Sequence, residues 1–314
     1  MTATSGHRLR KALVLCVDAA YLPFALFLAA QIDAQEPGRD YDICLISDAP
    51  LEIPAAFAHL RIRLYEPVAD DAYGMLDEGH LARSTYLRLW APRLLAADYD
   101  RIIYLDSDIW ADGAGLSRLF ETDLRGKVLA AVLDVQQWYR PKRNVKEFRV
   151  LNRPLTRYFN GGMLLIDTAR FEEEAILDRC IALARTAPQA VIHHDQSLLN
   201  LVINGDWVEL SPVWNWQWPM KYPLFGDWVG PRLLHFIGAI KPWDDPEGLY
   251  SRRFHMAYEA FFATYFPGSD RVRPPGPSPL QSRRRIAWMF LRFSTLRRAV
   301  LRYMAQFPDD YATR

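Results

Sequence analysis

The chain has 314 residues, half of them apolar and 24% charged, with a formal net charge of +1. This composition is typical of a globular protein rather than a disordered one, and the near-neutral total gives the whole molecule no strong electrostatic steering field. The length suits one large α/β domain or two smaller ones with a substantial core.

The three cysteines, Cys16, Cys44 and Cys180, are odd in number, far apart and free of any CxxC pair. This pattern argues against a disulfide framework or a zinc site. We therefore expect a reducing compartment, with Cys16 and Cys44 as ordinary buried thiols inside apolar runs.

The first apolar segment, residues 12–30, follows the basic stretch His7-Arg8-Leu9-Arg10-Lys11 and so has the outline of a signal peptide or a short membrane span. Asp18 lies inside it, however, and a charge at mid-membrane costs about 3 kcal/mol on insertion scales. Pro23 also interrupts the run. We prefer a buried strand at 12–17, a loop, and a helix from about Leu22, with a secretory segment as the alternative.

The first half of the chain alternates strand and helix patterns. Apolar runs predict buried strands at 12–17, 42–46, 62–64, 101–105 and 128–133, and helical spacing predicts helices at 22–34, 80–95 and 115–120. Such alternation indicates an α/β sandwich with a mainly parallel sheet, whose sites lie beyond the carboxyl ends of the strands. Asp18 and Asp106 occupy that position. No GxGxxG follows the first strand, which disfavours an NAD-type fold.

The second half continues with a predicted strand at 161–166 and helices at 171–185 and 195–204. Six of the ten tryptophans then fall between Trp207 and Trp243, among prolines and glycines. Flat aromatic faces pack well on sugar rings, so this loop-rich region is either part of a platform for a saccharide or ordinary core packing.

The C-terminal part has a different character. We divide the chain into a catalytic domain at 1–266, a Pro-rich linker at 267–280 and a basic amphipathic helical segment at 281–314. Residues 281–306 carry seven arginines, and no acid occurs between Asp270 and Asp309. Arginines with Trp288, Phe290 and Phe293 suit the surface of an anionic membrane, on which this helix would lie without crossing. Nucleic-acid binding is the alternative.

Asp106-Ser107-Asp108 directly follows the apolar strand at 101–105. Paired carboxylates at such a point suit a hard divalent cation held against a diphosphate. An added imidazole from His235 would favour Mn²⁺ over Mg²⁺, and Lys241 could supply a point charge for the departing diphosphate. Taken alone, His235 could instead be a hydrogen-bonded core histidine and Lys241 a solvated surface amine.

An ordered set of motifs resembles glycosyltransferase family eight, retaining enzymes of the GT-A fold that use nucleotide-diphospho-sugars. The resemblance covers about residues 10 to 265, and the final HxxGxxKPW pattern makes it specific. The residues that carry it are Val17-Asp18-Ala19-Ala20-Tyr21, Tyr86-Leu87-Arg88-Leu89, Tyr104-Leu105-Asp106-Ser107-Asp108, Tyr158-Phe159-Asn160-Gly161-Gly162, His194-Asp195-Gln196 and His235-Phe236-Ile237-Gly238-Ala239-Ile240-Lys241-Pro242-Trp243.

The resemblance implies a role for each matching position. Asp18 and Tyr21 would bind the base and ribose. At the neighbouring position 20 the family often has a polar residue, and this chain has Ala20. The metal ligands would be Asp106, Asp108 and His235. The diphosphate or sugar would contact Arg88, Gly238 and Lys241, and the transferred sugar would be surrounded by Asp134, Asn160, Asp195 and Gln196.

Each of these residues also has a structural interpretation. Tyr21 could belong to the core, Arg88 could be a helix-surface cation, and Asn160-Gly161-Gly162 could form a turn before a strand. Asp195 could cap the helix that follows it. The ordered co-occurrence of the motifs favours the functional interpretation.

The resemblance implies a metal-dependent retaining transferase that moves glucose or galactose from a UDP-sugar to a glycan or glycolipid. The basic C-terminal helix leads to the hypothesis that the acceptor is a lipid-linked or lipopolysaccharide glycan made at the inner face of the cytoplasmic membrane. The alternatives are a nucleotide-sugar-binding module without turnover and a UDP-sugar hydrolase. Retention in glycosidases usually requires a carboxylate nucleophile. Gln196 is a neutral amide, so we expect the acceptor hydroxyl to attack from the leaving-group face, with Asp195, Gln196 and Lys241 as the catalytic set.

Overall fold

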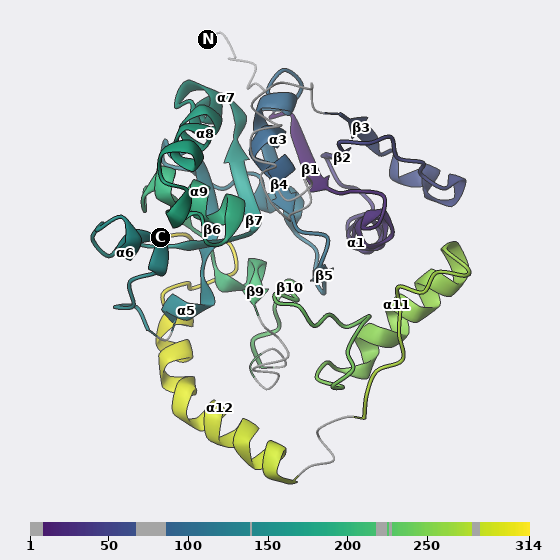
Figure 1. The fold of residues 1–314 in the computed structure, drawn as a ribbon. Helices are drawn as coiled ribbons and strands as arrows, with labels where there is room; N and C mark the ends of the chain where they lie inside the picture. The colour runs from purple at the N-terminus through teal and green to yellow at the C-terminus, as the bar shows by residue number, and fades with distance from the viewer. Residues whose placement is uncertain (1–8, 67–85, 139, 218–224, 226–227, 278–282) are drawn as a thin grey trace, which may run out of the picture.

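A computed structural model describes residues 9–66, 86–138, 140–217, 225, 228–277 and 283–314. A seven-stranded sheet forms its centre, in the order β3-β2-β1-β4-β7-β6-β8 (Figure 1). The strands are β1 (Lys11–Cys16), β2 (Asp42–Ile46), β3 (Arg63–Tyr65), β4 (Arg101–Leu105), β6 (Leu129–Leu133), β7 (Phe159–Asp167) and β8 (Val208–Glu209).

The sheet is mainly parallel, as the alternation predicted. Strands β1, β2, β3 and β4 pair in parallel, as do β6 and β8, and only β7 runs antiparallel to its two neighbours. The central strands are continuous apolar runs with almost no exposed surface, the pattern of strands covered on both faces. The predicted α/β fold class is therefore confirmed.

Helices and short helical turns connect these strands. The α-helices are α1 (Leu22–Gln35), α3 (Leu87–Leu95), α4 (Leu116–Leu119), α5 (Val135–Trp138), α6 (Lys146–Val150), α7 (Thr168–Glu173), α8 (Ile176–Thr186), α9 (His194–Ile203), α11 (Arg252–Tyr265) and α12 (Arg283–Met304). The 3₁₀ turns are η1 (Ala55–Leu60), η3 (Pro188–Ala190) and η4 (Pro212–Trp214). Residues 80–85 of the predicted helix at 80–95 lie outside the described part of the chain.

The predicted helix at 171–185 is wrong as a single element. The structure has two helices there, because Ala175 adopts a left-handed backbone with φ 49° between α7 and α8. The α7 helix also begins earlier, at Thr168, where Asp167 accepts a hydrogen bond from the Arg170 backbone at 3.0 Å and caps the helix.

A second, three-stranded sheet has the order β5-β10-β9, with β5 (Ile109–Ala111), β10 (Leu233–His235) and β9 (Trp216–Gln217). The β5 strand begins one residue after Asp108, and the antiparallel register with β10 sets His235 opposite Ile109. This small sheet therefore brings residues far apart in the sequence to the carboxyl end of β4.

The tryptophan-rich region is mostly core. Trp207, Trp214, Trp216 and Trp243 are all at most 5% exposed, whereas Trp228 is 50% exposed. Trp218 lies outside the described residues. Packing therefore accounts for four of the six tryptophans, and the predicted platform for a saccharide has little exposed aromatic surface to form on.

The C-terminal segment is joined to the body at one end. Val300, Tyr303 and Phe307 are buried in the main core, while the first half of α12 runs outward along the lower edge of the molecule in Figure 1. After the helix, Arg314 exchanges backbone hydrogen bonds of 2.9 Å with Glu209 at the edge strand β8. None of the helices within the described ranges combines the length and the apolar character that a membrane crossing requires.

Candidate active site

The two carboxylates of the Asp-x-Asp motif lie where β4 ends. Register pairs Leu105 with Met163 of β7, and the Asp106 backbone N–H continues the ladder by donating to the Gly162 carbonyl at 2.9 Å. The chain then turns through Ser107 and Asp108 into β5. The motif therefore joins the two sheets, at the carboxyl end of a central strand where α/β folds place their ligands.

His235 reaches this point through the small sheet. It is the last residue of β10, and the next backbone N–H, that of Phe236, donates to the Asp108 carbonyl at 3.1 Å. Its imidazole is 3% exposed. Sheet register, rather than sequence proximity, thus sets His235 beside Asp108.

Two amide oxygens determine the tautomer of His235. The Asn160 Oδ1 atom accepts from the Gly162 backbone N–H at 3.1 Å, so its orientation is fixed, and it lies 3.1 Å from His235 Nδ1. Asn215 donates to the same Oδ1 at 2.9 Å and therefore turns its own Oδ1 to His235 Nδ1, at 3.0 Å. An amide oxygen only accepts, so Nδ1 carries the proton and Nε2 keeps its lone pair.

That free Nε2 atom faces both carboxylates. It lies 3.5 Å from Asp106 Oδ2 and 3.1 Å from Asp108 Oδ1, and ligand atoms from the three residues all fall within 4.8 Å of one another. Asp108 Oδ1 is buried and accepts no hydrogen bond from any described residue. Nitrogen and oxygen lone pairs therefore converge on one point with few donors to satisfy them.

Lys241 closes the other side of the cluster. Its ammonium donates to Asp108 Oδ2 at 2.5 Å and to the Phe236 carbonyl at 2.7 Å, with 15% of the side chain exposed. Burial alone would raise the pKa of Asp108, but the ammonium charge of Lys241 holds that pKa well below its usual range. Asp108 is therefore ionised at neutral pH, and Lys241 is no solvated surface amine.

These residues fit a divalent cation. Two carboxylates and one imidazole nitrogen are donors that Mn²⁺ accepts, with coordination positions left for other oxygen ligands. Gly162 leaves the necessary room: a Cβ atom there would collide with the His235 ring and would lie 2.9 Å from Asp106 Oδ2. The cluster is thus shaped by a residue that has no side chain.

Arg88 connects the cluster to the carboxylate of Asp195. Its guanidinium lies 3.0 Å from Asp106, forms an ion pair with Asp195 through Nε, and donates to the Gly161 carbonyl at 2.8 Å. The side chain is 13% exposed, so the predicted alternative of a helix-surface cation is wrong. Arg88 holds two acidic side chains in place as well as contributing positive charge.

Asp195 and Gln196 project from the first turn of α9. Asp195 is 2% exposed, and burial raises its pKa to about 6 although the Arg88 charge lowers it. Gln196 Oε1 accepts from the Gly161 backbone N–H at 2.8 Å and from Asn160 at 3.3 Å. Its Nε2 donates to the Tyr158 hydroxyl at 3.3 Å. The cap of α9 is His193, so the capping role considered for Asp195 is wrong.

The Asn160-Gly161-Gly162 segment belongs to β7, and the predicted alternative of a turn is wrong. The pairing with β6 shifts between Ala131 and Val132, so β7 carries extra residues at this point. Such a bulge re-aims side chains toward a site. Here it directs Asn160 to His235 and the Gly161 backbone to Arg88 and Gln196.

Four predicted residues lie outside this contact network. Asp18 accepts from the Tyr21 backbone at 2.9 Å, and Tyr21 is 41% exposed, so its ring does not belong to the core. Asp134 is 7% exposed at the start of α5, and burial raises its pKa. Gly238 has φ 100°, a left-handed conformation that favours glycine in the loop between His235 and Lys241.

Several side chains around the site were missed by sequence reasoning. The Tyr104 hydroxyl donates to Asp106 at 2.6 Å, Gln217 Oε1 accepts from the Val135 backbone at 2.8 Å, and buried Glu147 accepts from the Tyr158 hydroxyl at 2.9 Å. Asn215 is the fourth. Tyr104 stands inside a quoted motif and could have been found there, whereas Asn215, Gln217 and Glu147 carry no local signal of a role.

Comparison with known proteins finds a matching family model and several sequence relatives. The family model described as Glycosyl transferase family 8 matches residues 12–247. Glycosyltransferase GlyF of Streptococcus pneumoniae is 32% identical over 171 residues, 52% of this chain and 39% of GlyF. Lipopolysaccharide 1,2-glucosyltransferase of Escherichia coli is 27% identical over 194 residues, 59% of this chain and 56% of that enzyme. The matched part thus spans about half the length of these relatives.

A solved structure supports the fold. The galactosyltransferase LgtC, in complex with donor and acceptor sugar analogs, superimposes with a TM-score of 0.64 at 20% identity. The match covers 79% of this chain and 95% of LgtC. At this level of identity the likeness supports the shared architecture and not the substrates.

Proposed function

We propose that this chain, which belongs to glycosyl transferase family 8, transfers a hexose from a UDP-sugar to a glycan or glycolipid acceptor with retention of anomeric configuration. The observation that carries the proposal is the convergence of Asp106, Asp108, His235 and Lys241 at the carboxyl end of β4. Sequence relatives named lipopolysaccharide 1,2-glucosyltransferase and lipopolysaccharide 1,3-galactosyltransferase support glucose or galactose as the hexose.

The acidic cluster explains why a cation is needed. Asp106, Asp108 and Asp195 bring three carboxylates together with Arg88 and Lys241 as the neighbouring cations, so a diphosphate would meet an excess of negative charge. A divalent cation held by Asp106, Asp108 and His235, with Mn²⁺ the best match to the ligands, would supply positive charge against the diphosphate oxygens.

Lys241 acts on the leaving group. When the bond between the sugar and the β-phosphate breaks, the diphosphate gains negative charge, and the preorganised ammonium stabilises that charge. Gly238, in a left-handed conformation, lies in the same loop, and its backbone would contact the diphosphate. In the proposed site, Asp18 and the exposed ring of Tyr21 hold the ribose and base from the neighbouring carboxyl end of β1.

The sugar would be held by Asp134, Asn160, Asp195 and Gln196. The Gln196 amide is held by three hydrogen bonds and is a poor nucleophile, so no covalent sugar adduct is expected on it. The acceptor oxygen instead bonds to the anomeric carbon on the leaving-group face, while the bond between that carbon and the β-phosphate oxygen breaks. The departing phosphate takes the proton of the acceptor hydroxyl. Trapping a glycosyl adduct on Asp195 would exclude this route.

A membrane role is part of the proposal. Trp288, Phe290 and Leu291 are 44%, 57% and 61% exposed on the outward half of α12, among arginines. Aromatic and basic side chains together suit the interface of an anionic bilayer. We infer that α12 lies on the inner face of the cytoplasmic membrane and presents the catalytic domain to a membrane-bound acceptor.

Product analysis distinguishes transfer from the other functions. The protein is incubated with Mn²⁺ and UDP-glucose or UDP-galactose, with and without a glycan acceptor mixture, and UDP and saccharides are quantified. Transfer predicts UDP release that rises with acceptor and matches new glycoside with the donor's anomeric configuration. Equal release without acceptor would identify a hydrolase, and donor binding without release would identify a binding module.

A further inference from the structure

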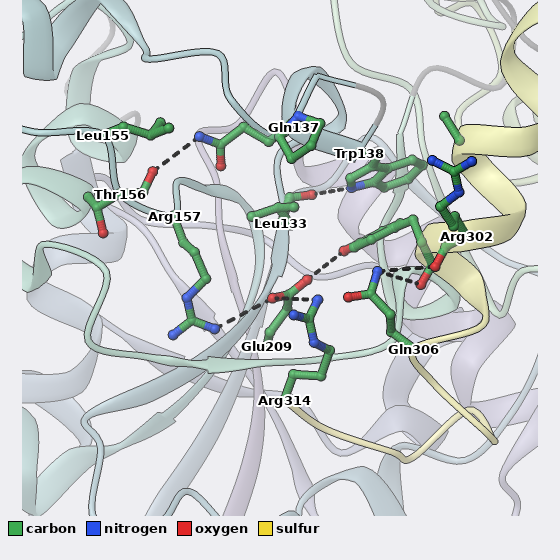
Figure 2. Close-up of a pocket in the computed structure, with 13 residues that line it drawn as sticks. Leu133, Gln137, Trp138, Leu155, Thr156, Arg157, Glu209, Arg302, Gln306 and Arg314 are labelled. Atoms are coloured by element: carbon green, nitrogen blue, oxygen red, sulfur yellow. Dashed lines mark hydrogen bonds and ion pairs between the residues drawn. The ribbon is translucent and has the colours of Figure 1, made fainter.

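A cavity of about 790 Å³ lies between α12 and the edge of the main sheet (Figure 2). Its lining comes from the end of β6, from α5, from the segment before β7, from β8, and from the docked end of α12 with the residues after it. None of the residues predicted for the donor or the metal lines it. The volume is in the range of small-molecule sites.

The charged side chains in the cavity are mostly cationic. Arg157, Arg302 and Arg314 line it with a single carboxylate, Glu209. The Glu209 side chain is 1% exposed and accepts from the Tyr303 hydroxyl at 2.9 Å. Figure 2 shows Arg157 and Arg314 converging on this carboxylate, at 3.5 and 3.7 Å. One negative charge is thus shared by two guanidiniums, and a net positive charge remains.

Arg302 supplies the accessible part of that charge. It stands on the exposed side of α12, and no hydrogen bond or ion pair engages its guanidinium in the described part of the chain. By contrast, Arg157 also donates to the Gly205 and Trp207 carbonyls. An anion entering the cavity would therefore meet Arg302 first, with Arg314 beside Glu209.

The remaining wall is rigid and partly apolar. Trp138 stacks on Tyr303 with ring centroids 5.5 Å apart, and its indole N–H donates to the Leu133 carbonyl at 2.7 Å. Leu155 is 43% exposed at the same cavity. Aliphatic, amide and guanidinium groups together suit a saccharide that bears a charged group.

The cavity adjoins the proposed sugar site. Leu133 lines the cavity, and the next residue is Asp134. Trp138, at the other end of α5, lines it too, while Tyr303 and Arg302 belong to the helix proposed to lie on the membrane. A saccharide bound here would therefore lie against the proposed membrane helix and beside the end of β6 that precedes Asp134.

We propose that this cavity binds an anionic saccharide, a phosphate- or carboxylate-bearing part of the acceptor, distant from the hydroxyl that reacts. The guanidiniums of Arg302 and Arg314 hold the anionic group, and the exposed side chain of Leu155 contacts the sugar ring. This inference rests on the proposed function and names the class of its acceptor.

Direct binding tests the inference without turnover. Maltose 1-phosphate is titrated into the full chain with UDP and diamagnetic Mg²⁺ present, because paramagnetic Mn²⁺ would broaden the signals. Its ³¹P resonance is followed by NMR, with maltose as the uncharged probe in a parallel ligand-observed titration. We expect saturable binding of maltose 1-phosphate and no saturable binding of maltose. Arg302→Ala should weaken it about tenfold through the loss of one charge-assisted contact. Ala299→Phe, which fills the cavity from α12, should also weaken it.

Arg297→Ala is the matched control, because Arg297 is an exposed arginine of the same helix that does not line the cavity. The inference would be overturned if Arg302→Ala and Arg297→Ala lost equal affinity for maltose 1-phosphate. It would also be overturned if inorganic phosphate bound as tightly as maltose 1-phosphate. Complete displacement by phosphatidylglycerol vesicles would assign the charge to a lipid headgroup instead. Calorimetry of UDP with Mn²⁺ tests the donor site separately, so failure of either proposal is recognised on its own.

Discussion

At the scale of single residues, the candidate metal site depends on groups around the ligands as much as on the ligands. The backbone N–H of Gly162 orients Asn160, which with Asn215 places the proton of His235 on Nδ1. Outer partners of this kind set the tautomer and the direction of a metal-binding imidazole. Hence the cluster can be disturbed without replacing any of its three ligands.

Gly162→Ala should abolish Mn²⁺ binding. The new Cβ atom would collide with the His235 ring and lie 2.9 Å from Asp106 Oδ2, and both groups would have to move. We expect Mn²⁺ affinity, measured by electron paramagnetic resonance, to fall by about 100-fold or more. This is the upper end of the effects seen when a group that supports a metal ligand is lost.

Gly38→Ala is the control, since a Cβ atom there meets nothing within 4 Å. It should leave the affinity unchanged. Both variants should keep the unfolding temperature above the assay temperature. Normal Mn²⁺ affinity in folded Gly162→Ala protein would show that the cation binds elsewhere.

The buried carboxyl of Asp195 should make stability depend on pH. Burial raises its pKa to about 6, above the ordinary value of 3.8, so between these values the folded state binds more protons than the unfolded state. The free energy of unfolding contributed by this group therefore falls as pH rises from 4 to 6, by on the order of 3 kcal/mol.

Urea unfolding of wild type and Asp195→Asn across pH 4 to 7 measures this contribution. As pH rises, the free energy of unfolding of wild type should fall relative to that of Asp195→Asn. A constant difference would mean that the Arg88 ion pair fully offsets the burial of Asp195 and that its pKa is not raised.

The predicted site residues that the structure brings together were found through motifs. The metal cluster, Arg88, Asn160, Asp195, Gln196 and Lys241 were all quoted from motifs, and the structure brings them together. Asn215 and Glu147 were missed because an isolated amide or carboxylate has no recognisable pattern until the fold shows what it touches.

At the scale of elements, boundaries followed the apolar runs closely when a strand was buried. The strands at 42–46 and 101–105 were predicted with the bounds that the structure has. Short elements were not foreseen: β5, β9 and β10 have two or three residues and show no periodicity. The break at Ala175 was also missed, since neither glycine nor proline marks it.

The helix α12 gives an element-level prediction. Replacing Trp288 and Leu291 by serine removes two exposed apolar side chains from its outward half. If this half lies on the bilayer, flotation with vesicles of phosphatidylcholine and phosphatidylglycerol should weaken by roughly tenfold or more, because both side chains would lose apolar burial.

Met256→Ser is the control for that experiment, because Met256 is 63% exposed on α11. It should float like wild type. Deleting residues 281–314 would be a poor test, since Val300, Tyr303 and Phe307 belong to the core. Unchanged flotation of the double variant would refute membrane association through α12.

At the scale of the whole molecule, two sheets and a docked helix create two neighbouring regions. The carboxyl ends of β1 and β4 carry the proposed donor and metal site, and the space beneath α12 carries a cationic cavity one residue from Asp134. The alternation of strand and helix patterns could indicate the α/β class but not this arrangement, which depends on the register of β10 and on the docking of Tyr303 against Trp138.

The most direct test of the account is UDP release from a panel of UDP-sugars, with Mn²⁺ and with EDTA, for wild type, Asp108→Asn and Asp112→Asn. Asp112 is the matched control because it lies just after β5 and pairs with Arg253 outside the cluster. We predict Mn²⁺-dependent release from UDP-glucose or UDP-galactose that falls about 100-fold or more in Asp108→Asn and persists in Asp112→Asn. Release that survives EDTA, or that is equal in both variants, would contradict the account.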